Sequence, residues 1–296
     1  MLLDSQIYRL TVTFNNSHLQ SVTIKALGSG EAMHERAETP HILISHLTKR
    51  YNTAQRGELL ALRNVSLEAA RGEFISIVGP SGCGKSTLLY IVAGLLDASG
   101  GSVIINGKPI DGPSPDRGVV LQNFSIFPWR RIADNVVYGP EMRGVPKAER
   151  RRLARKYLEL VGLDDFADYY PRELSGGMKQ RVAIAQMLAC NPSIFLMDEP
   201  FGALDALTRE ILQDQLLQLW ERDRKTVLFV THSIDEAVLL SDRVVIMGTK
   251  PGRVKQVVPI KLPRPRQPAE IRAHPDFGTL RNFIWASIRE ESLEAA

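Results

Sequence analysis

Short apolar runs rich in β-branched residues recur along the middle of the chain and alternate with stretches of helical periodicity. Such alternation predicts an α/β domain with a largely parallel sheet, because parallel strands need long crossover connections that are usually helices. The runs expected to form strands are FISIV (74–78), SVII (102–105), GVVL (118–121), SIFLM (193–197), TVLFV (226–230) and RVVIM (243–247).

Strand signals are missing between about residues 124 and 180, where helical patterns replace them. One predicted helix has its start marked by Pro146, since proline is favoured in the first turn. Another helix is predicted from Met178 to Ala189. The segment therefore reads as a helical subdomain inserted into the α/β domain. The apolar face of its first helix is formed by Leu153, Tyr157, Leu160 and Val161.

Both ends of the chain differ from this central pattern. Residues 1–40 combine alternating apolar positions with the polar stretch GSGEAMHERAETP, which predicts an N-terminal extension made of a hairpin and a flexible linker. Alternatively the natural start is Met33, and the intact mass of the native protein would decide. We expect a core domain at 41–272 and a C-terminal helical tail at 273–296, which contains an amphipathic segment.

The composition, net charge and cysteine content of the chain limit the classes of protein to which it can belong. The chain has 296 residues, of which 44% are hydrophobic and 24% charged, as in ordinary globular proteins. A net charge of +4 permits an anionic partner, but the densest basic run, 147–156, contains Glu149 and favours a solvated helix face over a nucleic-acid surface. Cys83 and Cys190 give no disulfide framework, which suits a reducing, cytoplasmic setting. The apolar stretch 86–96 is too short to span a bilayer.

The sequence GPSGCGKST directly follows the strand run FISIV and precedes the helical run LLYIVAGLL. Strand, glycine-rich loop and helix in this order form the context of a P-loop. Glycines let backbone N–H groups surround phosphates, Lys85 reaches the β and γ oxygens, and Ser86 offers its hydroxyl to Mg²⁺. The residues predicted to bind nucleotide are Gly79, Pro80, Ser81, Gly82, Cys83, Gly84, Lys85, Ser86 and Thr87.

Polar residues follow three other predicted strands. Asp198 and Glu199 end the run SIFLM, where one carboxylate can hold Mg²⁺ and the next can polarise an attacking water. Gln122 ends GVVL, and His232 follows TVLFV. Since ligands of open α/β sheets bind at the carboxyl ends of the strands, all four side chains are expected at one site.

A second phosphate-binding surface is predicted at LSGGMKQR, residues 174–181. A small polar residue and two glycines before a helix leave backbone N–H groups and the positive end of the helix dipole available to an anion. Taken alone, the segment could equally be an ordinary glycine-rich helix start. Its position about 90 residues after Lys85 suggests instead that two chains share nucleotide.

With these motifs in this order, residues 41 to about 285 resemble the ATP-binding subunit of an ABC transporter. The resemblance implies ATP hydrolysis with Mg²⁺ and a P-loop α/β core with an antiparallel β subdomain and an inserted helical subdomain. It implies that Tyr51 stacks on adenine and that Gln122 contacts Mg²⁺ and senses the membrane partner. Glu199 then matches the general base and His232 the switch histidine at the γ-phosphate, while Lys85 belongs to the catalytic set.

The same resemblance implies a homodimer. Ser175, Gly176 and Gly177 match the signature that binds the γ-phosphate of ATP held by the opposite subunit. Asp205, in FGALD, matches the aspartate that crosses the dimer interface.

The segments 116–136 and 200–209, with the PRPR tail, look like the nitrate, sulfonate and taurine group of bacterial importers. That likeness implies two membrane permease subunits, a periplasmic solute-binding protein that acts indirectly, and a peripheral position on the cytoplasmic face of the inner membrane. Phe124, Phe127 and Trp129 would receive a permease helix, or alternatively would only pack the helical subdomain.

Two other classes share some of these motifs. An ABC-type ATPase that acts on nucleic acid or ribosomes usually inserts a long coiled coil or fuses two ATPase domains, and neither fits the spacing of Lys85 and Ser175. We therefore expect no nucleic-acid partner. A binding module that does not hydrolyse ATP would not need Glu199 and His232.

Overall fold

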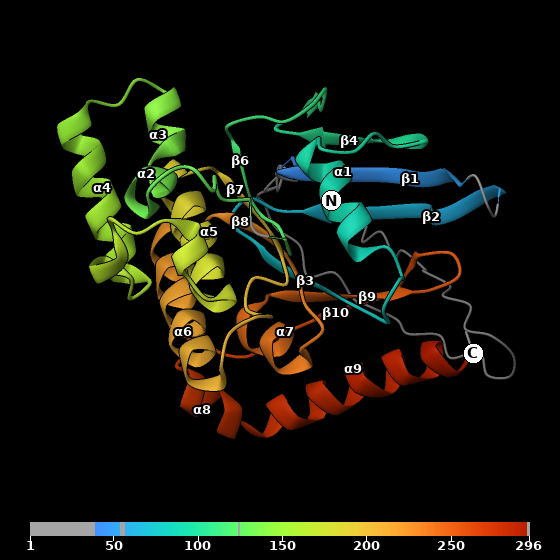
Figure 1. Cartoon of the computed structure of the whole chain (residues 1–296). Coiled ribbons are helices and arrows are strands. Elements are labelled where there is room, and N and C mark those ends of the chain that lie inside the picture. The colour runs from blue at the N-terminus through green and yellow to red at the C-terminus, as the bar shows by residue number, and fades with distance from the viewer. Residues whose placement is uncertain (1–38, 54–56, 124, 295–296) are drawn as a thin grey trace, which may run out of the picture. The chain divides into compact units, whose positions relative to one another are not determined.

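A six-stranded, mainly parallel sheet forms the centre of the chain (Figure 1). The computed structural model describes residues 39–53, 57–123 and 125–294. The strand order is β10-β9-β3-β8-β7-β6, and only β10 runs antiparallel to its neighbour. These strands are β3 (Phe74–Val78), β6 (Arg117–Val120), β7 (Ile194–Asp198), β8 (Thr226–Val230), β9 (Arg243–Gly248) and β10 (Arg253–Pro259). The predicted hairpin at the N-terminus and Phe124 lie outside the described residues.

A second, antiparallel sheet has the order β2-β1-β4-β5. Its strands are β1 (Ile42–Thr53), β2 (Gly57–Ala69), β4 (Gly100–Ile105) and β5 (Lys108–Pro109). The sequence predicted that the run 102–105 belongs to the parallel sheet, and this was wrong. The run lies in β4, which pairs antiparallel with β1, with Ile42 opposite Ile105. An apolar run predicts a buried strand but carries no information about its direction.

Helices cover both faces of the parallel sheet (Figure 1). On one face α1 contacts β7 and β8, and it also contacts β2 of the antiparallel sheet. On the other, α7 contacts β3 and α9 contacts β9. Alternate strand residues point into two separate apolar clusters, so the strands are buried on both sides and read as continuous apolar runs. These helices are α1 (Lys85–Ala93), α6 (Ala206–Asp223), α7 (Ile234–Leu240), α8 (Pro268–Ala273) and α9 (Pro275–Glu294).

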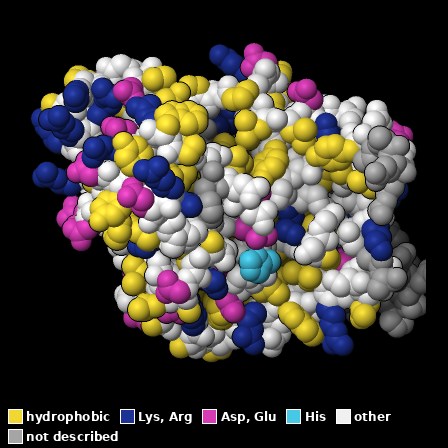
Figure 2. All heavy atoms as spheres, viewed as in Figure 1, with side chains coloured by type: hydrophobic (Ala, Val, Ile, Leu, Met, Phe, Trp, Pro, Cys, Tyr) yellow, Lys and Arg dark blue, Asp and Glu magenta, His cyan; other side chains and the backbone are white. Residues whose placement is uncertain are grey.

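The described residues between β6 and β7 form only helices and the loops that connect them. It contains α2 (Ile132–Val136), α3 (Tyr138–Met142), α4 (Lys147–Leu160), two short 3-10 helices and α5 (Gly176–Cys190). Pro146 precedes α4, as predicted. Val161 is buried and the other three predicted apolar positions are half-buried, but the sequence reading missed Leu158, which is buried. Figure 2 shows Lys and Arg side chains gathered over α4, whose basic run is largely exposed, as a solvated face requires.

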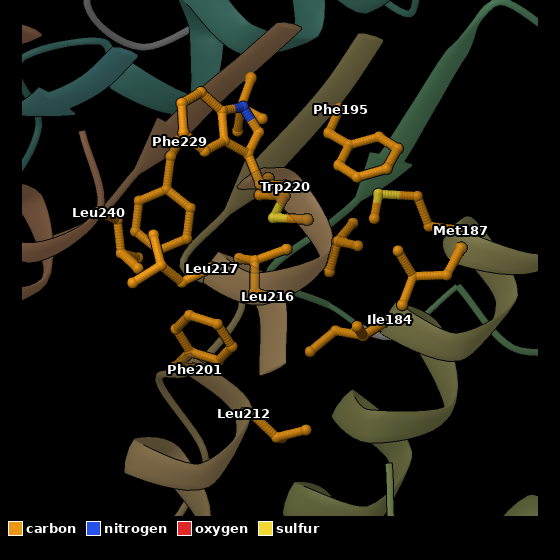
Figure 3. Packing of buried hydrophobic residues seen from close by; sticks show 14 of the residues in the cluster. Ile184, Met187, Phe195, Phe201, Leu212, Leu216, Leu217, Trp220, Phe229 and Leu240 are labelled. Carbon is orange, nitrogen blue, oxygen red and sulfur yellow. The ribbon is translucent and has the colours of Figure 1, made fainter. Parts of the chain in front are cut away.

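The larger apolar cluster joins α5 and α6 to the sheet. Figure 3 shows Trp220, Leu216 and Leu217 of α6 packed near Phe229 of β8, with Ile184 and Met187 of α5 beside them. Trp220 is fully buried and its indole N–H donates to the carbonyl of Lys225 at 2.7 Å. Within the part of the chain that the structure describes, no helix is both long enough and apolar enough to cross a bilayer.

Candidate functional site

The glycine-rich loop predicted as a P-loop connects β3 to α1. Gly84 caps α1 with φ 91°, and a Cβ there would lie 2.5 Å from the Leu62 side chain, so both conformation and space require glycine. The Lys85 ammonium is almost fully buried and donates to the carbonyls of Gly79 (2.9 Å) and Pro80 (3.0 Å). The cation therefore lies over the loop that would hold the phosphates.

The loop itself is suited to phosphate. Gly79, Gly82 and Gly84 all have positive φ, and left-handed residues within such a loop let successive N–H groups converge on an anion. Ser81 and Gly82 are exposed, whereas Cys83 is fully buried and anchors the loop. Burial raises the pKa of the Cys83 thiol.

Asp198 at the end of β7 is fully buried and accepts hydrogen bonds from Ser86 (3.1 Å) and Tyr90 (3.0 Å). Burial raises the pKa of Asp198, and burial with the neighbouring carboxylate raises the pKa of Tyr90 to about 12. A hydroxyl and a carboxylate are the oxygen ligands that Mg²⁺ prefers, so these residues fit that ion. Among the described residues no cluster of three or more His, Cys, Asp or Glu forms a metal cage, and Mg²⁺ is usually held by one or two carboxylates with substrate phosphates.

The contact of Tyr90 with Asp198 was not predicted from the sequence. Tyr90 lies one helical turn after Ser86 on α1, so the i,i+4 spacing in a predicted helix was the available signal.

Glu199 and His232 meet beyond adjacent strands. Glu199 follows β7 and His232 follows β8, and Glu199 Oε2 lies 3.3 Å from His232 Nδ1. The backbone of Glu199 adopts φ 49°, which is uncommon for a residue with a side chain, and its N–H donates to the carbonyl of Val230. The Glu199 side chain is 24% exposed and that of His232 67%, so both can reach a ligand at the sheet edge.

The segment LSGGMKQR forms the start of α5. Ser175 is the N-cap, and its hydroxyl accepts from the N–H of Met178 at 3.3 Å. The helix begins at Gly176, two residues before the predicted start. Ser175 and Gly176 are exposed. Among the described residues no hydrogen bond or ion pair joins Ser175, Gly176 or Gly177 to the P-loop of the same chain.

Gln180, further along this helix, is a second residue that the sequence reading missed. Its side chain is 2% exposed and bridges the loop after β7, donating to the carbonyl of Glu199 (2.8 Å) and accepting from the N–H of Ala203 (2.9 Å). A Cβ on Gly177 would lie 3.0 Å from the Ala203 carbonyl. The signature segment and the loop that carries Glu199 are therefore directly packed.

Three other predicted site residues, Tyr51, Gln122 and Asp205, lie in different parts of the fold. Tyr51 on β1 is half-buried, and its hydroxyl lies 3.4 Å from that of Thr87, which places the ring beside the P-loop helix. Gln122 lies beyond β6, is exposed, and makes no side-chain hydrogen bond to the residues that the structure describes. Asp205 caps α6 by accepting from the N–H of Thr208 at 3.0 Å, which lowers its pKa.

A groove with a volume of about 360 Å³ opens between β6, α3 and α5. Leu121, Tyr138 and Met142 are among its lining residues. Phe127 packs on Tyr138 with ring centroids 4.4 Å apart, while Trp129 is 73% exposed. The rings of Phe127 and Trp129 lie 5.7 Å apart between centroids. Both predicted roles, packing in the helical subdomain and contact with a permease helix, therefore stay open for these side chains.

Comparison with known proteins places the chain in a family. The ABC transporter family model matches residues 62–202. A putative ATP-binding protein of Brucella abortus is 51% identical over 249 residues, which are 84% of this chain and 94% of that protein. The taurine import ATP-binding protein of Roseobacter denitrificans is 44% identical, with 82% and 93% covered. The bicarbonate transport ATP-binding protein of Synechococcus elongatus is 46% identical, with 82% of this chain and 37% of that protein covered.

Two solved structures of ABC cassettes are also similar to this chain. A dimeric bacterial ABC transporter cassette superposes with a TM-score of 0.69 at 36% identity, covering 75% of this chain and 99% of that one. A dimeric post-hydrolysis state of an ATP-binding cassette bound to ADP and Pi gives 0.67 at 35% identity, with the same coverage. The predicted P-loop α/β fold is confirmed. The chain belongs to the ABC transporter family and is one of its ATP-binding, ATP-hydrolysing subunits.

Proposed function

We propose that this chain hydrolyses ATP to drive the import of a small solute, such as nitrate, a sulfonate or taurine, through a separate membrane permease. The observation that carries the ATP site is the meeting of Lys85, Asp198, Glu199 and His232 at the carboxyl ends of three neighbouring strands, β3, β7 and β8. Relatives named for taurine and bicarbonate transport support the import role.

In the proposed ATP complex, the loop from Gly79 to Thr87 surrounds the phosphates. The Lys85 ammonium exchanges the carbonyls of Gly79 and Pro80 for phosphate oxygens, a short movement from its present contacts. Tyr51, beside Thr87, stacks on adenine, which is worth about 1 to 3 kcal/mol for a base on an aromatic ring. This assignment makes residues 41–272 the ATP-binding domain, flanked by the extension at 1–40 and the tail at 273–296.

Ser86, Asp198 and Gln122 would hold Mg²⁺. The ion would neutralise charge on the β- and γ-phosphates. Asp198 suits this role because Ser86 and Tyr90 already orient both of its oxygens.

Glu199 acts as the general base in the proposed reaction. Its carboxylate takes a proton from a water molecule as the water oxygen attacks the γ-phosphorus, and the bond from that phosphorus to the bridging oxygen of ADP breaks. His232, 3.3 Å from the carboxylate, contacts the γ-phosphate. Lys85 stabilises the charge on the transferred group.

Two copies of the chain act together in this proposal. Each ATP lies between one P-loop and the Ser175, Gly176 and Gly177 segment of the partner, and Asp205 crosses the interface. Exposure of Ser175 and Gly176, and the dimeric state of both similar cassettes, support the arrangement. Because ATP contacts both chains only when they close, it binds the closed dimer more tightly and shifts the population toward it.

The permease docks on the groove beside β6, α3 and α5. Trp129 is exposed, and Phe127 packs on Tyr138, which lines the groove. With Phe124, which lies outside the described residues, they would supply apolar contact area for a helix of the membrane subunit. The chain would then sit on the cytoplasmic face of the cell membrane, and a periplasmic binding protein would deliver the solute to the permease from the other side.

Replacement of Glu199 by Gln tests the chemical assignment. E199Q should lower kcat on the order of a hundredfold or more and leave ATP binding intact, because the amide keeps the shape but cannot take a proton. E159Q, on the exposed surface of α4, is the matched control and should hydrolyse ATP like the parent. Turnover of E199Q at the parent rate would show that Glu199 is not the base.

A further inference from the structure

The turn between β9 and β10, residues 249–252, packs directly against the P-loop. The N–H of Gly252 donates to the carbonyl of Ala61 (3.0 Å), and its carbonyl accepts from the N–H of Arg63 (2.8 Å). A Cβ on Gly252 would overlap the carbonyl oxygen of Cys83, in the middle of the P-loop. Backbone therefore packs on backbone at this contact, with no side chain to absorb a displacement.

The C-terminal helix α9 holds this turn from the opposite side. Glu291, only 3% exposed, pairs with Arg253 at 2.9 Å and accepts from the N–H of Thr249 at 3.2 Å. Arg253 also donates to the carbonyl of Thr249 at 2.9 Å. One carboxylate thus contacts Thr249, the first residue of the turn, and Arg253, the residue that follows it.

Burial of this carboxylate is unusual for a helix on the surface. Its neighbour Glu290 is 63% exposed and pairs with Lys255 at 2.6 Å, which is the common surface arrangement. Lys255 also lies 3.4 Å from Glu291, so among the described residues Glu291 has two cationic partners and Glu290 has one. A buried ion pair is weak evidence for net stability, and in some proteins its role is to fix a geometry. The geometry imposed here is that of the turn beside the P-loop.

We propose that Glu291 is a positioning residue for nucleotide binding: it holds the turn at 249–252 against Cys83 and so keeps the P-loop in its phosphate-binding shape. The inference rests on the proposed role of the P-loop. It gives the C-terminal helix an influence on ATP affinity that acts through the turn.

The chemical step should be less affected than binding. Glu199 and His232 follow β7 and β8, and Gln180 fixes the loop of Glu199. Among the described residues, none of these three side chains makes a hydrogen bond or ion pair with the turn at 249–252. Loss of Glu291 therefore weakens ATP binding more than it lowers kcat, which it affects through Lys85 of the P-loop. A residue that only stabilised the fold would not separate the two quantities.

The experiment compares E291A with E290A in the full-length protein. We would measure the Kd for a fluorescent ATP analogue, the KM and kcat of ATP hydrolysis, and thermal unfolding. E291A should raise Kd and KM on the order of fivefold, within the range given by residues outside a ligand site, with kcat within about twofold. E290A should match the parent in all of these.

Equal Kd values for E291A and the parent would overturn the inference, as would an equal rise in Kd for E290A. If E291A does not fold, G252A tests the same contact from the other side, because its methyl group must push the turn away from Cys83. A parent-like Kd for a folded G252A would also overturn it. Failure of the parent itself to bind the analogue would instead contradict the proposed ATP site.

Discussion

Gln180 offers a sharp test of how the site is held together. Its amide makes two hydrogen bonds to the loop after β7, one to the carbonyl of Glu199 and one from the N–H of Ala203. Replacement by Ala removes both bonds without touching Glu199 itself. A buried neutral hydrogen bond contributes about 0.5 to 1.5 kcal/mol net, so the pair stabilises the loop by about 1 to 3 kcal/mol.

The loss should appear in catalysis as well as in stability. About 1.4 kcal/mol of lost positioning corresponds to about a tenfold lower rate. We therefore expect Q180A to lower kcat about tenfold, with little change in the KM for ATP, since the contacts of Lys85 and the P-loop are untouched. Steady-state hydrolysis at saturating ATP measures the first quantity, and urea unfolding measures the second.

The control is Q218A, whose parent side chain is exposed on α6 and bonds only to Asp214 among the described residues. It makes the same chemical change away from the site. If Q180A is destabilised but keeps the kcat of the parent, the bridge does not position Glu199. If it is neither destabilised nor slower, the energy assigned to the two hydrogen bonds is wrong.

Three further outcomes are expected. S175A should slow hydrolysis by the dimer but leave nucleotide affinity of dilute monomer unchanged; a weaker monomer Kd would contradict the shared site. W220A should lower the free energy of unfolding by about 3 to 5 kcal/mol in urea titrations, because Trp220 is fully buried, and a loss below 1 kcal/mol would contradict this. Burial raises the pKa of Glu236, so its contribution to stability is present below the ordinary glutamate pKa and is lost as pH rises through the raised value. E236Q should remove that part of the decline in unfolding free energy with pH, and an unchanged profile would refute it.

The strands of the parallel sheet were predictable because their burial is two-sided. β3, β7 and β8 are buried at every position, so each appears as a continuous apolar run whatever its neighbours are. Asp198, Glu199 and His232 could be placed at one edge because strand ends converge in parallel sheets. Both inferences need only local sequence.

Contacts between distant segments were not predictable in this way. The start of α5 was predicted at Met178, directly after two glycines, and glycine is a poor helix former. In the structure the Ser175 cap and the close packing of Gly177 on Ala203 carry the helix back to Gly176. The antiparallel direction of β4 was not predicted for a similar reason. It depends on pairing with β1, a strand far away in the sequence.

Gln180 connects the start of α5, where Ser175 lies, to the loop that carries Glu199. On the proposed assignments, Ser175 touches the ATP of the partner subunit, while Gln180, on the same helix, holds the loop of this subunit's own base. A change at one ATP can therefore reach the base at the other through a single rigid element. This coupling predicts that Q180A weakens the dependence of hydrolysis on dimerisation as well as its rate, which a titration of kcat against protein concentration would measure.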